Sequence, residues 1–203
     1  MNSELLGFNY RFEEGTGTRT LLMLHGTGAD ENDLIPLGRA LDPDAPLLSP
    51  RGKVLENGMP RFFRRHAEGV LDVDDLKART HELVEFIDAA AKEHDLDRSQ
   101  IVSVGFSNGA NIAASTLLLR PDALQAAILL HPMVPFEPDG PVDLAGMRVF
   151  IGTGRNDPLI EPASTERLAE ILKTSGAEVT IEWSHAGHQL TQGEIAAAAA
   201  WLG

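Results

Sequence analysis

Short apolar segments of strand length alternate along the chain with longer segments in which apolar residues recur every three or four positions. Several of the short segments are apolar almost throughout, which is typical of strands buried on both faces of a parallel sheet. The predicted strands are Thr20–Leu24, Ala45–Ser49, Ile101–Phe106, Gln125–Leu130, Arg148–Gly152 and Glu178–Trp183, with Tyr10–Glu13 as an expected edge strand.

The longer segments predict four helices. The first has Asp74 and Asp75 in its first turn, where the helix dipole favours acidic side chains. The last opens on Thr191-Gln-Gly-Glu194, which has the pattern of a capping box. The predicted helices are Asp74–His94, Asn108–Arg120, Pro162–Thr174 and the alanine-rich tail from Gln192 to Leu202.

This order of elements predicts an α/β fold with a doubly wound, mostly parallel sheet and helices on both faces. No linker or internal repeat divides the chain, so residues 1–203 are expected to form one domain, a size at which a chain buries a substantial core. The connection from His131 to Met147 holds four prolines, so we expect no helical cap domain over the sheet: Pro132, Pro135, Pro138 and Pro141.

The segment Gly105-Phe-Ser107-Asn-Gly109 joins a predicted strand to a predicted helix. It matches G-x-S-x-G in the strand–turn–helix setting, where a sharp turn lifts the serine above the sheet at the positive end of the helix. The glycines avoid collisions with the neighbouring strand and helix. Ser107 is therefore the candidate nucleophile, and a glycine-rich turn with an incidental serine is the alternative.

A second glycine-rich turn, His25-Gly-Thr-Gly-Ala-Asp30, follows the first apolar strand. Serine hydrolases with this type of sheet take one oxyanion donor from such a turn and the other from the residue after the nucleophile. The candidate donors are thus the backbone N–H groups of Thr27 and Asn108, with His25 bracing the loop. A phosphate-binding turn is the alternative, but the segment lacks both G-x-G-x-x-G and a lysine.

Seven histidines compete for the role of general base. His185 and His188 lie in the loop after the last strand, and His188 is favoured because it lies nearer the capped helix. His131 follows a strand, and we expect it to have a packing role. The His185/His188 spacing also occurs in metal sites, but no third ligand of suitable spacing follows, so we expect no metal and no cofactor.

Asp157 is the candidate acid that orients the histidine. It ends a loop just after a predicted strand and is followed by Pro158. Its alternative role is to cap the next helix. The chain order Ser107, Asp157, His188 is the order used by hydrolases of this fold. A serine hydroxyl is a weak nucleophile near neutral pH, so it needs a histidine to accept its proton and an acid to fix the tautomer.

The composition argues against several classes of function. The formal net charge of -13 opposes binding to nucleic acid or to an anionic membrane, because both would be repelled. The chain has no cysteine, which excludes disulfides and thiolate chemistry. It shows neither a signal-peptide pattern nor an apolar run of membrane-spanning length, so a cytoplasmic location is expected. A homodimer is compatible with these features.

Taken together, these segments make the chain resemble the bacterial phospholipase/carboxylesterase family of small α/β-hydrolases, relatives of acyl-protein thioesterases and lysophospholipases. The resemblance covers nearly the whole chain. It implies the α/β-hydrolase fold, the triad Ser107, Asp157 and His188, and oxyanion donors at Thr27 and Asn108. It rests on LHGTGADENDLIPL from Leu24, SPRG from Ser49, GFSNGA from Gly105, GTGRNDPLI from Gly152 and HAGHQLT from His185.

One departure from the family pattern bears on the substrate. Many members carry Gln-Gly-Gly after the serine, where this chain has Asn-Gly-Ala, and it looks closer to the predicted esterases associated with hydroquinone stress than to the thioesterases. The segment Arg61-Phe-Phe-Arg-Arg65 resembles the family's pocket edge.

The expected function is hydrolysis of short, soluble carboxylic esters by a serine carboxylesterase through an acyl-enzyme, with a small molecule as the substrate. A thioesterase or lysophospholipase-type acyl hydrolase is one alternative. A non-hydrolytic enzyme or an idle binding protein on the same fold is another. The expected apolar walls of the substrate cleft are Phe62, Phe63, Met133, Val134 and Leu190.

Overall fold

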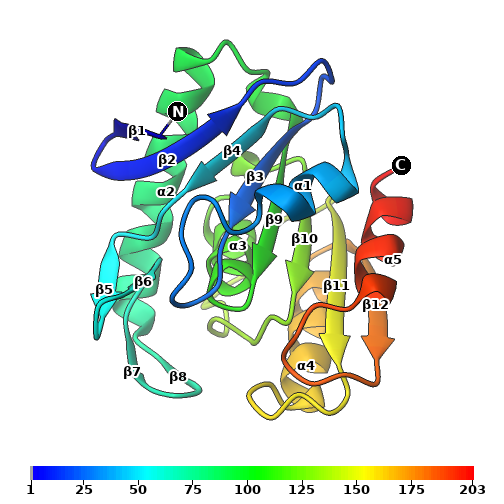
Figure 1. Ribbon diagram of the computed structural model, residues 1–203. Helices are drawn as coiled ribbons and strands as arrows, with labels where there is room; N and C mark the ends of the chain where they lie inside the picture. Colours follow the sequence, from blue (N-terminus) through cyan, green and yellow to red (C-terminus); the bar gives the residue numbers. More distant parts are fainter. Residues whose placement is uncertain (1) are drawn as a thin grey trace.

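The computed structural model describes residues 2–203 and is built around one eight-stranded sheet (Figure 1). Its strands are β1 (Asn2–Leu5), β2 (Phe8–Glu13), β3 (Thr20–Leu24), β4 (Leu47–Pro50), β9 (Ile101–Phe106), β10 (Ala126–Leu130), β11 (Arg148–Gly154) and β12 (Glu178–Ser184). Their spatial order is β1-β2-β4-β3-β9-β10-β11-β12. The pairs from β4 to β12 are parallel, while β1–β2 and β2–β4 are antiparallel. The expected mostly parallel sheet is confirmed.

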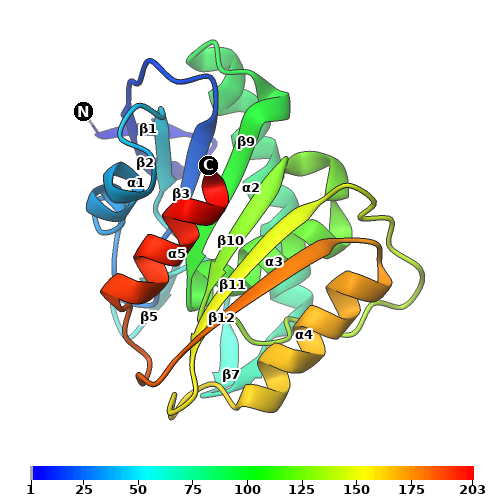
Figure 2. The ribbon, with the colours of Figure 1, turned by 90° about the vertical axis from the view of Figure 1, so that its right-hand side faces the viewer.

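Five α-helices of the described residues 2–203 cover the two faces of the sheet, as Figure 2 shows. One face carries α1 (Ile35–Leu41) and α5 (Gln192–Leu202); the other carries α2 (Val73–Glu93), α3 (Asn108–Leu119) and α4 (Pro162–Thr174). Each helix layer packs a separate apolar cluster against the sheet. The strand β10 is buried along its whole length because both of its faces meet a helix layer.

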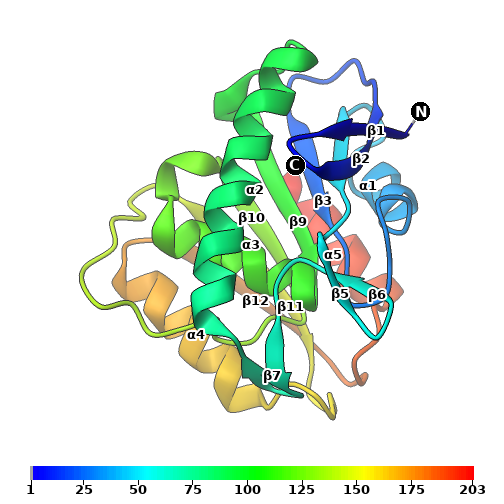
Figure 3. The ribbon, with the colours of Figure 1, turned by 90° about the vertical axis from the view of Figure 1, so that its left-hand side faces the viewer.

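Two small hairpins flank the carboxyl ends of the parallel strands (Figure 3). They are formed by β5 (Val54–Glu56) with β6 (Met59–Arg61) and by β7 (Arg65–Ala67) with β8 (Val70–Leu71). The sequence pattern predicts neither hairpin, because strands of two or three residues are too short to show a periodicity.

Other differences from the sequence-based expectation are local. β2 pairs with β1 on its outer side, so β1 and not β2 is the edge strand. α1 was not predicted, because seven residues beginning at Ile35-Pro36 carry a weak helical pattern. Residues 131–147 contain no helix, and no cap domain covers the sheet within the described chain, as expected from the prolines. Within residues 2–203, no helix is long and apolar enough to cross a membrane.

The turn between β9 and α3 is unusually tight. Ser107 has φ 52 and ψ -112, and its N–H donates to Leu130 O at 2.9 Å. A Cβ at Gly109 would lie 1.9 Å from Leu24 O, and one at Gly105 would lie 2.5 Å from Gly109 O. Only glycine fits at these two positions, because a side chain at Gly109 would push helix α3 away from strand β3 and one at Gly105 would push it away from β9.

The close packing at Gly109 predicts a large loss of stability on substitution. Gly109→Ala is expected to lower the free energy of unfolding by about 3 kcal/mol, because the methyl group meets fixed backbone. Gly193→Ala is a matched control, since its nearest neighbour is Thr191 Oγ1 at 3.9 Å. It should raise stability by about 0.5 kcal/mol. Urea unfolding curves measure both, and similar stabilities for the two variants would contradict this account of the turn.

Candidate active site

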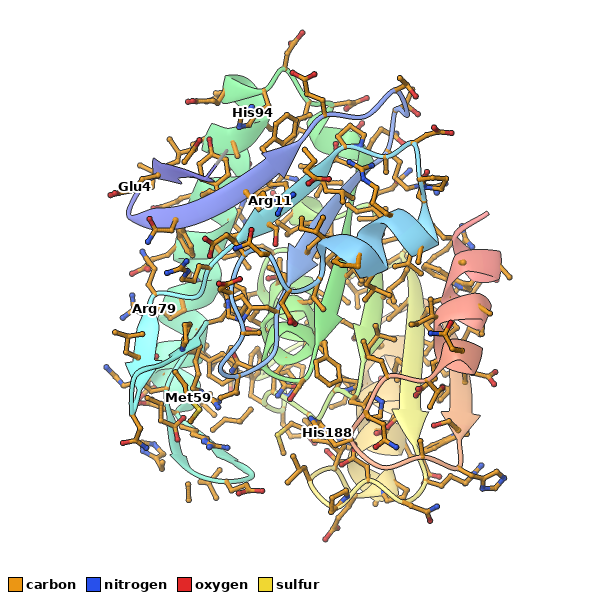
Figure 4. The ribbon with its side chains drawn as sticks, viewed as in Figure 1. Glu4, Arg11, Met59, Arg79, His94 and His188 are labelled. Carbon is orange, nitrogen blue, oxygen red and sulfur yellow. The ribbon has the colours of Figure 1, made fainter. Side chains whose placement is uncertain are left out.

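Three segments that are far apart in the sequence meet at the carboxyl edge of the sheet. Ser107 follows β9, Asp157 follows β11, and His188 lies in the loop between β12 and α5. In Figure 4, His188 lies near the arrowheads of the parallel strands. The structure thus brings together the three residues that the sequence singled out.

These three side chains form one line of hydrogen bonds. His188 Nε2 lies 2.9 Å from Ser107 Oγ, and His188 Nδ1 lies 2.7 Å from Asp157 Oδ2. An ionised carboxylate only accepts, so Nδ1 carries the hydrogen and Nε2 is left to accept from the hydroxyl. This tautomer suits transfer of the serine proton to the ring.

The carboxylate of Asp157 is buried, and both of its oxygens accept hydrogen bonds from the protein. Its Oδ1 accepts from the N–H groups of Leu159 at 2.9 Å and Ile160 at 3.2 Å, while Oδ2 faces His188 and also His131 Nδ1 at 2.8 Å. Burial alone would raise the pKa of Asp157, but the hydrogen bonds from His131, Leu159 and His188 outweigh it and hold the pKa below its usual value. The acid is therefore ionised near neutral pH.

The two candidate oxyanion donors, Thr27 and Asn108, line the same cavity as Ser107. Among the hydrogen bonds of residues 2–203, neither backbone N–H donates to a carbonyl, so both are available to a ligand. Asn108 is the first residue of α3, and its side-chain Oδ1 accepts from Phe62 N at 2.8 Å. That bond holds the start of the helix against the segment that follows β6.

The loop that carries Thr27 is fixed from both sides. His25 Nδ1 donates to Gly26 O at 2.7 Å, and its Nε2 accepts from Gly52 N at 3.0 Å, which confirms the predicted bracing role of this histidine. Burial lowers the pKa of His25, consistent with a neutral ring. On the other side, the buried guanidinium of Arg61 donates from Nη1 to Thr27 Oγ1 at 2.7 Å.

Ser107 lies between two adjoining cavities. One has a volume of about 50 Å³ and the other of about 430 Å³. Both are lined by Thr27, Arg65, Glu68, Ser107, Leu159 and His188. The small cavity is closed further by side chains that include Arg61, Asn111, Met133 and Ile160. Its walls are therefore mixed polar and apolar.

The predicted apolar walls are only partly found there. Met133 lines the small cavity. Phe62 and Phe63 are 2% and 0% exposed and belong to the core, so their predicted role as cleft walls is corrected. Val134 and Leu190 are half-buried and pack against the apolar clusters rather than lining either cavity.

The arginines at the ends of the Arg61–Arg65 segment reach the cavities instead of the phenylalanines between them. Arg61 Nε donates to Phe63 O at 3.1 Å and lies 3.2 Å from Glu56 Oε2. Arg65 Nε donates to both oxygens of Glu56. Leu159 and Ile160 also line the small cavity, and the sequence analysis did not predict this. Their position directly after the candidate acid and Pro158 could have indicated that they lie near the site.

His131 was expected to pack, and it is fully buried, but it also bonds to Asp157. The ligand-type atoms of His131, Asp157 and His188 lie within 4.8 Å of one another, a grouping that could hold a metal ion. The two Nδ1-to-Oδ2 distances are those of hydrogen bonds, and they account for this close approach. His185, the other candidate base, is exposed.

Residues 13–203 match the protein family described as Phospholipase/Carboxylesterase. The chain belongs to this family. It is 53% identical over 190 residues to a Bacillus subtilis (strain 168) protein named as a hydrolase, MhqD, covering 94% of this chain and 95% of that one. The crystal structure of the Bacillus cereus carboxylesterase superposes with a TM-score of 0.94 at 52% identity, covering 96% and 92% of the two chains.

The structure of YahD with malic acid is also similar, with a TM-score of 0.91 and 33% identity over 96% of this chain and 98% of that one. The family and these neighbours establish an α/β-hydrolase fold and place the chain among the carboxylesterase-type hydrolases. The candidate site lies where the sheet's parallel strands end, which is where open α/β sheets bind their ligands.

Proposed function

We propose that this protein is a serine carboxylesterase that hydrolyses short, water-soluble esters through an acyl-enzyme. The observation that carries the proposal is the hydrogen-bonded line from Ser107 through His188 to Asp157, with the serine facing two cavities. A nucleophile, a base within hydrogen-bond reach and an acid that orients the base are the parts that acyl transfer requires.

In the first half of the reaction, Ser107 Oγ attacks the ester carbonyl carbon while its proton passes to His188 Nε2. The N–H groups of Thr27 and Asn108 stabilise the negative oxygen of the tetrahedral intermediate. The C–O bond to the alcohol then breaks, and the alcohol oxygen takes the proton from His188. The acyl group remains on Ser107.

In the second half, water attacks the acyl carbon and gives its proton to His188. The tetrahedral intermediate collapses, the bond to Ser107 breaks, and the serine oxygen recovers the proton. The carboxylic acid leaves. The negative charge of Asp157 stabilises the imidazolium of His188 in both halves.

The sizes of the cavities support a small substrate. The cavity of about 50 Å³ next to Ser107 takes only a short chain, while the adjoining 430 Å³ is open to a larger group. One side of the ester, acyl or alcohol, must therefore be short. Malic acid, the small polar acid in the related YahD structure, is in keeping with such a substrate. Arg65 and Asn111 favour a polar group over a lipid tail in the small cavity.

The first prediction from the proposed function concerns Ser107. Ser107→Ala is expected to lower kcat on p-nitrophenyl acetate by about 10⁶, because no nucleophile remains. Circular dichroism should show an unchanged fold, since only one hydroxyl is lost. Turnover within a few-fold of the unmodified protein would refute the assignment of the nucleophile.

The second prediction separates the two histidines of one loop. His188→Ala should be nearly as damaging as Ser107→Ala, and Asp157→Asn should lower kcat by about 10⁴ through the wrong tautomer. His185→Ala is the matched control: its side chain is exposed, so its kcat should change less than about twofold. The reverse order of the two histidine variants would show that the base is His185.

The third prediction concerns chain length on each side of the ester. With p-nitrophenyl acetate, butyrate and octanoate, kcat/KM should fall by about tenfold or more from butyrate to octanoate if the acyl group enters the small cavity, because the added methylenes do not fit in a volume of about 50 Å³. A parallel series of alkyl acetates of increasing alcohol length tests the opposite placement, in which the alcohol group enters the small cavity. A maximum at long chains in both series, or activation by micelles, would favour a lysophospholipase-type enzyme instead.

A further inference from the structure

Behind the candidate acid, His131 is enclosed between two buried carboxylates. Its Nδ1 lies 2.8 Å from Asp157 Oδ2, and its Nε2 lies 3.2 Å from Glu194 Oε1. All three side chains are 0% exposed. His131 follows β10, Asp157 follows β11, and Glu194 lies in the first turn of α5, so the contact joins three separate parts of the fold.

The polar contacts of this cluster favour a positive charge on His131. Asp157 Oδ2 only accepts, so the Nδ1 of His131 carries a hydrogen. If the ring were neutral, the lone pair of Nε2 would face Glu194 Oε1 and repel it. Glu194 Oε2 is already occupied by the N–H and hydroxyl of Thr191. A doubly protonated ring donates from Nδ1 to Asp157, and its Nε2 lies 3.2 Å from Glu194 Oε1 in an ion-pair contact without a hydrogen bond.

The directions in which the pKa values of His131 and Glu194 are shifted agree with an ion pair between them. Burial would lower the pKa of His131, but Glu194 and Asp157 outweigh it and raise the pKa above its ordinary value. Burial would raise the pKa of Glu194, but the bonds from His131 and Thr191 lower it. Both partners are therefore shifted toward their charged forms.

The backbone at His131 gives a second, independent indication. Its φ of 53 lies in the left-handed region, which is strained for a residue with a Cβ. Its N–H donates to Gly152 O at 2.7 Å, which holds the turn beside the end of β11. Such strain is retained where the surroundings require one particular orientation. Here that orientation directs the ring at Asp157.

We propose that His131, kept as an imidazolium by Glu194, is a positioning residue that offsets part of the negative charge of Asp157 and so weakens the ion pair between Asp157 and a protonated His188. The inference rests on the proposed function. His131 and His188 donate to the same carboxylate oxygen, and their ring centroids are 5.2 Å apart. A positive charge at that distance opposes a second one on His188.

The charges around the two rings are few. His131 faces Asp157 and His188 from the neighbouring loops and Glu194 from α5, with the edge of the Phe106 ring beside it. His188 faces Asp157 and His131 on one side and, across the cavity, a group of charged residues on the hairpins: Arg61, Arg65 and Glu68. The buried residues Asp157, His131 and Glu194 together carry a net charge of -1. The four residues including His188 therefore become neutral as a group when His188 takes the serine proton.

Glu194 also caps α5, so its variant must separate the two roles. Its carboxylate and Thr191 form a capping box. Glu194→Gln keeps the box, because a glutamine serves equally at that position. The amide oxygen still accepts from Thr191, while the amide N–H₂ can donate to the Nε2 of a neutral His131. The variant thus removes the negative charge at position 194, and with it the partner that keeps His131 charged, and leaves each polar atom with a partner.

The test measures kcat/KM for p-nitrophenyl acetate against pH, together with ¹⁵N NMR of the histidine rings. In Glu194→Gln, His131 should become neutral, and the midpoint of the acid limb of the pH profile should move up by about 1 pH unit, because Asp157 then attracts a protonated His188 more strongly. The plateau at high pH should change by less than about twofold. His131→Asn, whose side chain tolerates a left-handed backbone, should move the limb in the same direction. Glu182→Gln, an exposed change of equal charge, is the control and should leave the limb in place.

An acid limb that does not move, an equal loss of activity at every pH, or a neutral His131 ring in the unmodified protein would overturn this role. The NMR result is independent of turnover. A neutral ring in an active enzyme would overturn only the role of His131, whereas an unmodified protein without ester turnover would overturn the proposed function and this role with it.

Discussion

The close approach of helix α3 to strands β3 and β9 is the constraint on which the rest of this structure depends. It is possible because Gly105 and Gly109 have no Cβ, and it forces Ser107 into a left-handed conformation at the tip of the sheet. From that position the serine hydroxyl reaches His188, and the first N–H of α3 reaches the same cavity. A steric condition in the core thereby sets the geometry of the candidate chemistry.

Behind the serine, polar side chains continue inward from His188 to Asp157, His131 and Glu194. Burying charges is costly unless each is paired and hydrogen-bonded. Here Asp157 accepts from two backbone N–H groups and two histidines, and Glu194 is held by Thr191 as well as His131. The ends of β10, β11 and α5 are thus held together by ionic contacts at the edge where catalysis is proposed. The same contacts fix the orientation of His188.

The sequence predicts those features of the structure that depend on residues close together in the chain. The apolar strands, the four longer helices and the glycine pattern around Ser107 all follow from nearest-neighbour sterics and periodicity. Contacts between loops are different, because no pattern in the chain shows that the turn after β10 faces the first turn of α5. His131 was therefore assigned to packing. Likewise, Phe62 and Phe63 were chosen as cleft walls for their apolarity, whereas the fold buries them and turns Arg61 and Arg65 to the cavities.

The central claim is that Ser107 is activated for attack on a carbonyl, and covalent labelling tests it most directly. The protein is treated with a fluorophosphonate, which reacts with activated serines and needs no knowledge of the natural substrate. Peptide mass spectrometry then locates the adduct. We expect one adduct, on Ser107, that forms far more slowly in His188→Ala. An unlabelled protein, or an adduct on another residue with Ser107 unmodified, would contradict it.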